Sequence, residues 1–155
     1  MPLDPDFVAD CPYGPEGLLI DEVLEIDPAR SRVVARMPTP AGLPLTVAQR
    51  SHPTRHPSHV AGGLLVHMTG MIGFLHAYYL LGLRHREGWI GYGARIHGAR
   101  FHDLAPPGAP LVLEGWATQV RRGAARVVVR YGFRFSQEDR LIYEGDQTAV
   151  WTRAK

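Results

Sequence analysis

The histidines of this chain are concentrated in a segment that contains no acidic residue. No aspartate or glutamate occurs between Asp27 and Glu87, whereas five of the eight histidines fall within residues 52–76. A neutral imidazole can both donate and accept a proton. Any acid–base chemistry in this segment must therefore use imidazoles, hydroxyls and backbone dipoles rather than carboxylates.

The segment divides into a loop and an apolar run. Residues 50–60 read RSHPTRHPSHV, and the prolines here fix φ and remove backbone donors, which predicts an ordered loop. Residues 61–83 read AGGLLVHMTGMIGFLHAYYLLGL without a charge, which predicts one long central helix that is buried on nearly every side. Its five glycines and two histidines dilute the run, and no basic flank supports insertion, so we expect no membrane span.

Length and composition are those of a globular chain. It has 155 residues, of which 45% are hydrophobic and 21% charged, as expected for a single domain over residues 1–155. The net charge is only +2 and the basic residues form no run, which gives no support for nucleic-acid binding. The lone Cys11 excludes an internal disulfide framework, and the N-terminus lacks a basic region followed by an apolar core, so we expect a cytoplasmic protein.

The pattern on both sides of the predicted helix is that of strands. Residues 18–27 and 31–37 are joined by a proline turn, which predicts a hairpin. Four further runs rich in β-branched and aromatic residues follow the helix, at 90–104, 110–120, 125–135 and 140–152. Two strands, one buried helix and four strands predict an α+β fold in which an antiparallel sheet wraps around the helix.

Four segments of the sequence resemble the 3-hydroxyacyl-acyl carrier protein dehydratases of fatty-acid synthesis. They are GLLIDEVLEIDP, the His-Pro loop followed by Gly-Gly and the apolar run, ARIHGARFHDLAPPGAPLVLEG, and RLIYEGDQTAVW. Their order and spacing are similar to the family over about residues 13–151. The resemblance implies the hotdog fold, a homodimer or larger assembly, and an acyl thioester of acyl carrier protein or coenzyme A as substrate. It implies no cofactor, because the thioester itself is the electron sink.

The resemblance also implies a catalytic pair, of which one member differs here. In the family, a histidine in the loop before the helix acts with a carboxylate on the helix, five residues after a glycine. His52 occupies the place of the histidine, allowing one extra loop residue, and the position five residues after Gly62 is His67. Dehydration of a 3-hydroxyacyl thioester would then use His52 to remove the α-proton and His67 to assist departure of hydroxide.

The start of the predicted helix supplies a second element of such a site. The first turn of a helix leaves backbone N–H groups unpaired and carries partial positive charge, so Gly62, Gly63 and Leu64 are candidates for binding a thioester carbonyl. The glycines permit a close approach of the ligand. One such donor typically contributes ~3 kcal/mol to lowering the barrier.

Each histidine also has a structural interpretation. His52 can brace the proline-rich loop, and His67 can be a hydrogen-bonded core residue beside Gly63 and Gly70. His76 lies about 180° around the helix from His67, so we interpret it as structural. A zinc site from the three loop histidines would lack a nearby carboxylate or cysteine and regular ligand spacing, so we expect no metal.

Other polar residues are weaker candidates. Arg100 and the basic group within residues 121–126 are candidates for binding the phosphates of coenzyme A or an acidic carrier protein, or else are solvated surface residues. Asp21 and Asp103 are candidates for a carboxylate from a neighbouring strand, or else lie at strand ends.

Two functions stand beside dehydration, which is the first expectation. A thioesterase on the same fold would polarise the same carbonyl and direct at its carbon a water held by His67 or Thr69. The resemblance also implies a tunnel at the subunit interface that receives the acyl chain, and a non-catalytic acyl-carrier or lipid-binding module would keep this tunnel without turnover.

Overall fold

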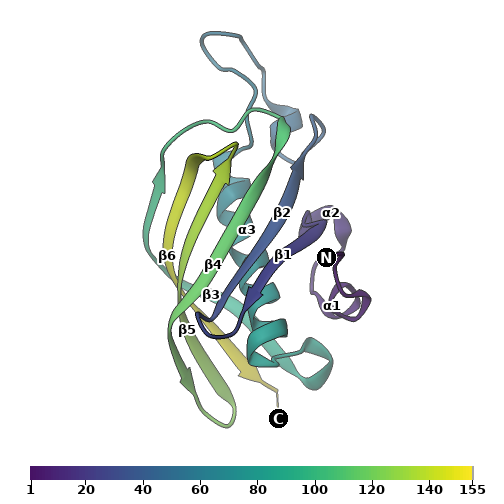
Figure 1. The fold of residues 1–155 in the computed structure, drawn as a ribbon, viewed down its shortest axis with the longest axis vertical. Coiled ribbons are helices and arrows are strands. Elements are labelled where there is room, and N and C mark those ends of the chain that lie inside the picture. Colours follow the sequence, from purple (N-terminus) through teal and green to yellow (C-terminus); the bar gives the residue numbers. More distant parts are fainter. Residues whose placement is uncertain (155) are drawn as a thin grey trace.

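The computed structural model describes residues 1–154. Within them, one antiparallel sheet has the strand order β1-β2-β4-β5-β6-β3. The strands are β1 Glu22–Asp27, β2 Arg32–Thr39, β3 Trp89–Phe101, β4 Gly108–Arg122, β5 Arg126–Gln137 and β6 Arg140–Arg153. The sheet curves around helix α3, Gly62–His76, as Figure 1 shows. This confirms the predicted α+β fold with an antiparallel sheet around one central helix.

Helix α3 lies at the centre of the fold. It continues as a π-helical turn, η2 Ala77–Leu81, and ends at Gly82, whose left-handed φ of 66° suits glycine. The predicted helix over 61–83 is therefore confirmed. The helix is long and apolar enough to cross a membrane by length and composition, but 61% of its apolar window is buried inside the protein, as in a core helix. Two short 3-10 helices, η1 Thr46–Ala48 and η3 His85–Glu87, flank it in the chain.

The N-terminal part departs from the prediction. The strand predicted from residue 18 begins at Glu22 instead. The residues before it form two short helices, α1 Pro5–Asp10 and α2 Pro15–Leu18, which the strand pattern does not predict. Each begins with a proline, whose missing N–H is not needed in the first turn of a helix. Leu19 then takes a left-handed φ of 59°, which ends α2 and turns the chain toward β1.

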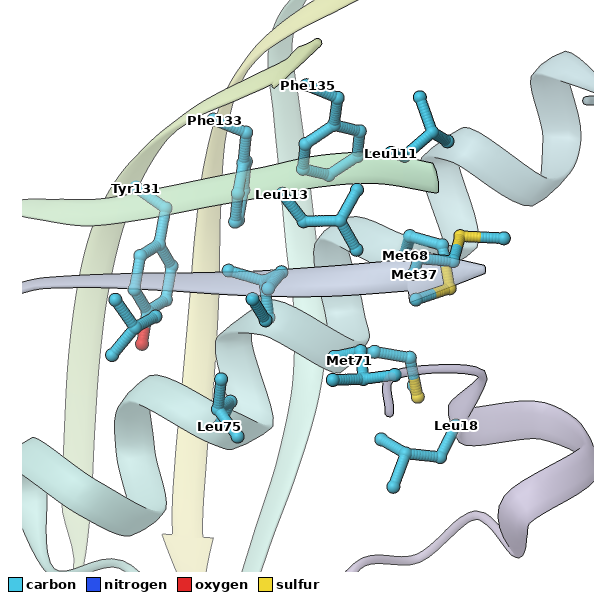
Figure 2. Packing of buried hydrophobic residues seen from close by; sticks show 14 of the residues in the cluster. Leu18, Met37, Met68, Met71, Leu75, Leu111, Leu113, Tyr131, Phe133 and Phe135 are labelled. Atoms are coloured by element: carbon cyan, nitrogen blue, oxygen red, sulfur yellow. The ribbon is translucent and has the colours of Figure 1, made fainter. Parts of the chain in front are cut away.

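The core fills the space between α3 and the concave face of the sheet. Figure 2 shows side chains of β4 and β5 packed against side chains of α3. Each of them is at most 2% exposed: Leu111 and Leu113 of β4, Tyr131, Phe133 and Phe135 of β5, and Met68, Met71 and Leu75 of α3. Gly115 allows the helix to approach β4, because a Cβ at this position would overlap Ile72. Burial of this apolar surface is the main stabilising contribution to the fold.

Strand β3 is an edge strand with an unpaired side. It pairs with β6, and no other strand of residues 1–154 pairs with it. Ile90, Tyr92 and Ile96 remain 53%, 51% and 53% exposed. Two register shifts interrupt its pairing with β6. An exposed apolar edge of this kind is typical of a surface that meets another chain.

Candidate functional site

A cavity of about 700 Å³ lies between helix α3 and the edge strand β3. Its wall is formed by residues 66–74 of α3, residues 90–96 of β3, the inner faces of β5 and β6, and the N-terminal residues Pro12 and Tyr13. Aromatic rings provide much of the wall: Phe74, Tyr92, Tyr131, Phe133 and Trp151. A cavity of this size and lining suits a small apolar ligand group.

Glycines on both walls keep the cavity open. Gly70 on α3 and Gly93 on β3 have no atom within 4 Å of the place where a Cβ would stand. Gly91 lies against Trp151, whose indole ring would overlap a Cβ at this position. Larger residues at these positions would fill the cavity or displace the tryptophan.

Two polar side chains meet at the wall of the cavity. The Thr69 hydroxyl lies 2.9 Å from Gln147 Oε1 and 2.6 Å from the carbonyl oxygen of Val66. Gln147 Nε2 is buried and has no hydrogen-bond partner among residues 1–154. The Tyr143 hydroxyl, also on β6, is likewise buried without a partner in this part of the chain. Of these two residues only Gln147 lines the cavity, so the unused hydrogen-bonding capacity in its wall is that of the Gln147 amide.

No carboxylate from residues 1–154 lines the cavity. Apart from tyrosine hydroxyls and the Trp151 indole N–H, its polar side chains are His67, Thr69, His85, Arg95 and Gln147. Within one chain, proton transfer in the cavity therefore depends on imidazole and hydroxyl groups.

The two aspartates that were candidates for a carboxylate lie at strand ends. Asp21, directly before β1, forms an ion pair with Arg36 at 2.9 Å. Asp103, just after β3, forms an ion pair with Arg140 at 2.6 Å. Both side chains are substantially exposed, and their positions fit the strand-end interpretation.

His67 lines the cavity, and the N-terminal segment holds its ring. Nε2 lies 2.7 Å from the carbonyl oxygen of Gly17, which can only accept, so Nε2 carries the proton. The ring of Tyr13 packs edge-on against it, with 5.0 Å between the centroids. Nδ1 is therefore the nitrogen of the neutral ring that can accept a proton. His67 is therefore hydrogen-bonded through Nε2, as in its structural interpretation, and can still accept a proton at Nδ1, as its catalytic interpretation requires.

His52 lies in the loop before α3, outside the lining of the cavity. Its Nδ1 accepts hydrogen bonds from the backbone N–H groups of Thr54 and Arg55, at 3.2 and 3.1 Å. In the neutral ring Nε2 then carries the proton, and neither nitrogen is left to accept another. This geometry is that of a residue that braces the loop. The role of His52 as a base stays a prediction.

The first turn of α3 also lies outside the lining of this cavity. Its N-cap makes no side-chain hydrogen bond, and Leu64 donates its N–H to a carbonyl of the same turn over 2.9 Å. The Phe101 ring approaches Gly62, and Leu45 approaches Gly63, to 3.2 and 3.6 Å from the places where Cβ atoms would stand. The predicted carbonyl-binding amides and His67 therefore do not share one cavity within a single chain.

The remaining predicted sites lie on the surface. Arg100 is exposed on β3, opposite Glu144 of β6. The basic group within residues 121–126 spans the end of β4 and the start of β5. No group of three His, Cys, Asp or Glu side chains within residues 1–154 is arranged to hold a metal ion.

His76 is fully buried in a hydrogen-bonded network. The Tyr131 hydroxyl donates to its Nδ1 at 2.9 Å, and its Nε2 lies 2.9 Å from Ser31 Oγ and 3.1 Å from the Ser31 carbonyl oxygen. Burial lowers the pKa of His76 from 6.5 to about 4, so the ring is neutral. Tyr131, which projects from β5 in Figure 2, also lines the cavity, so the network fixes one wall of it.

Nothing in the sequence pattern singles out Gln147 or Tyr143. Both lie on β6, whose central residues are half-buried on both faces. The one available signal is the spacing of Tyr143, Gly145 and Gln147, which places three residues on the same face of a strand.

Comparisons with known proteins identify the fold. No family model and no curated protein matches the chain. A mutant thioesterase from Pseudomonas aeruginosa matches with 18% identity, covers 99% of this chain and 96% of its own, and has a TM-score of 0.63. A thioesterase from Haemophilus influenzae matches with 19% identity, coverage of 94% and 87%, and a TM-score of 0.60. The fold is the hotdog fold.

A third hotdog structure is the PaaI protein from the phenylacetic acid degradation operon of E. coli. It is 14% identical over 90% of this chain and 86% of its own, with a TM-score of 0.59. The hotdog fold expected from the sequence is thus confirmed. Two of these three similar structures are named thioesterases, whereas the sequence segments resemble dehydratases.

Proposed function

We propose that this hotdog protein is an acyl-thioesterase, which hydrolyses the thioester of an acyl group with coenzyme A or a carrier protein. The observation that carries the proposal is the apolar cavity beside α3, with His67, Thr69 and Gln147 in its wall. Its aromatic surface suits an acyl group, and its polar groups suit a carbonyl and a water molecule. The names of the similar structures also support hydrolysis.

Dehydration, the first expectation from the sequence, has less support. It requires a base beside the α-carbon, and His52 lies outside the cavity with Nδ1 occupied by loop N–H groups. Hydrolysis requires a polarised carbonyl, a water molecule and a base, all of which the cavity can accommodate. We therefore place hydrolysis ahead of dehydration.

The helix suggests where the thioester lies. His67 and Thr69 are on opposite sides of Gly70 around α3, and the space over Gly70 is open. A thioester over Gly70 would have a water on the His67 side and hydroxyl and amide groups on the Thr69 side. The two side chains therefore take different roles rather than holding one water together.

In this proposal His67 is the general base. Its Nδ1 takes a proton from water as the water oxygen bonds to the carbonyl carbon, while Nε2–H keeps its hydrogen bond to the Gly17 carbonyl. The tetrahedral intermediate then loses its C–S bond, and Nδ1 returns the proton to the departing sulfur. The products are a carboxylic acid and a free thiol.

We also propose that two copies pair through β3 to form a homodimer. Pairing would cover the exposed Ile90, Tyr92 and Ile96 and satisfy the free edge of the sheet. Light scattering should give a dimer mass for the native chain and a lower mass for the double variant Ile90→Lys/Ile96→Lys. A dimer mass for the double variant would contradict this arrangement.

Incubation with acyl-coenzyme A thioesters tests the function. Octanoyl, phenylacetyl and 3-hydroxyoctanoyl thioesters separate the alternatives: free thiol indicates hydrolysis, enoyl product indicates dehydration, and binding without product indicates a carrier module. His67→Gln should lower hydrolysis by about a hundredfold or more. The matched control is His97→Gln, at a histidine of β3 that bonds Thr148 outside the cavity. A loss in His52→Gln with none in His67→Gln would restore His52 as the base.

A further inference from the structure

The Thr69 hydroxyl has one proton and two oxygens within reach. Val66 O lies at 2.6 Å and Gln147 Oε1 at 2.9 Å, and the hydroxyl can donate to only one of them. If it donates to Gln147, the amide NH2 group faces away from Thr69. If it donates to Val66, turning the amide by 180° lets the NH2 group donate to the Thr69 oxygen.

The Gln147 amide carries more protons than Thr69 can accept. The amide nitrogen carries two protons, and Thr69 can accept only one of them in the turned arrangement. In the other arrangement the nitrogen has no partner among residues 1–154. Folded proteins rarely leave a buried N–H without an acceptor. In the turned arrangement the nitrogen takes the place of Oε1 beside Thr69, and because Gln147 lines the cavity, a ligand there can accept from its second N–H.

The Tyr143 hydroxyl lies over the neighbouring part of the same face of β6. Tyr143, Gly145 and Gln147 alternate along β6 and share one face of the strand. A Cβ on Gly145 would stand only 2.9 Å from the Tyr143 hydroxyl, so the phenol reaches across the glycine. Burial raises the pKa of the Tyr143 phenol, and the nearby Gln147 amide partly opposes this rise. The Tyr143 hydroxyl therefore lies near the amide but makes no hydrogen bond to it in this structure.

We propose that Gln147 is the residue that binds the thioester carbonyl, through a hydrogen bond from its free N–H, with Thr69 and Tyr143 as positioning residues. This inference rests on the proposed thioesterase function and adds the group that polarises the carbonyl. A donor that is already oriented costs no reorganisation as negative charge develops on the oxygen. Across the open space at Gly70, the carbonyl carbon then faces the water at His67.

This assignment differs from carbonyl binding by the first turn of α3. Gln147 lines the cavity, whereas Gly62 and Gly63 do not. Replacement of the Gln147 side chain should therefore remove the hydrogen bond to the thioester carbonyl. If backbone amides of α3 made this hydrogen bond, the replacement would leave it in place.

The test uses Gln147→Met, which keeps the length of the side chain and removes both amide atoms. The matched control is Gln119→Met, at an exposed position of β4 outside the cavity. With octanoyl-coenzyme A, kcat should fall by about 10²–10³-fold in Gln147→Met and stay unchanged in the control. A second readout is the infrared carbonyl frequency of a bound octanoyl ketone analogue, in which CH2 replaces the thioester sulfur and the carbonyl carbon is ¹³C.

The hydrogen bond should lower the carbonyl frequency in the native protein and in Gln119→Met, and Gln147→Met should lose this shift. Tyr143→Phe, which removes only a hydroxyl, should lose part of this frequency shift. If Gln147→Met does not fold, Tyr143→Phe provides the test in its place. The same frequency in all four proteins would overturn the assignment even if hydrolysis occurs. A shift that depends on Gln147 without any hydrolysis would support the assignment and reject the thioesterase proposal. Failure to bind the ketone would overturn both.

Discussion

Acidification should destabilise the native protein more than a variant without His76, because the buried ring resists protonation. Burial lowers the pKa of His76 from 6.5 to about 4. Between these values the unfolded chain binds a proton that the folded chain does not, so stability is lost as the pH falls through this window. One pKa unit corresponds to about 1.4 kcal/mol, so the loss is about 2 kcal/mol near pH 5 and about 3 kcal/mol near pH 4. At still lower pH both states are protonated and the loss stops growing.

Urea titrations of the native protein and His76→Gln at several pH values measure this effect. Glutamine can donate to Ser31 and accept from Tyr131 but does not titrate. Carboxylates titrate in both proteins, so the difference between the two unfolding free energies isolates His76. We expect the advantage of the native protein to shrink by about 3 kcal/mol between pH 7 and pH 4. Parallel pH profiles would show that the ring protonates freely in the folded state and would refute the reasoning.

Two glycine substitutions test the packing of α3. Gly70→Leu should raise the free energy of unfolding by up to about 1 kcal/mol, because leucine favours helix, yet lower thioester turnover by about a hundredfold by filling the open space over the helix. Urea titration and thiol release measure the two effects, and full activity would mean that substrate binds elsewhere. Gly115→Ala should destabilise the protein by about 1–3 kcal/mol, because the new Cβ overlaps Ile72. Gly42→Ala, which meets no atom within 4 Å, is the control, and an equal loss in both would contradict the packing argument.

Much of the fold could be predicted because its signals are local. A run without charge over 61–83 favours burial as a helix, and α3 with η2 occupies Gly62–Leu81. The alternation within β5 matches its observed burial, in which every second residue from Val127 to Gln137 is buried. The start of β1 could not be predicted this way, because the left-handed turn at Leu19 leaves no trace in the hydrophobic pattern.

The candidate site could be predicted only in part. The acid-free segment contributes His67 and Thr69 to the wall of the cavity, which no carboxylate from residues 1–154 lines. Gln147 could not be predicted, because it meets Thr69 across 78 positions of sequence. The central residues of β6 are half-buried on both faces, so only pairing with β5 decides which face meets α3.

The sequence by itself determined which segments form the central helix and the strands, because periodicity and the absence of charge act within a single element. Only the tertiary structure decided what each histidine can do. The proton-accepting nitrogen of an imidazole depends on its partners, and these are the Gly17 carbonyl for His67, and Ser31 and Tyr131 for His76. Those partners lie 45 to 55 positions away in the chain, so the chemistry of the rings follows from packing and not from local sequence.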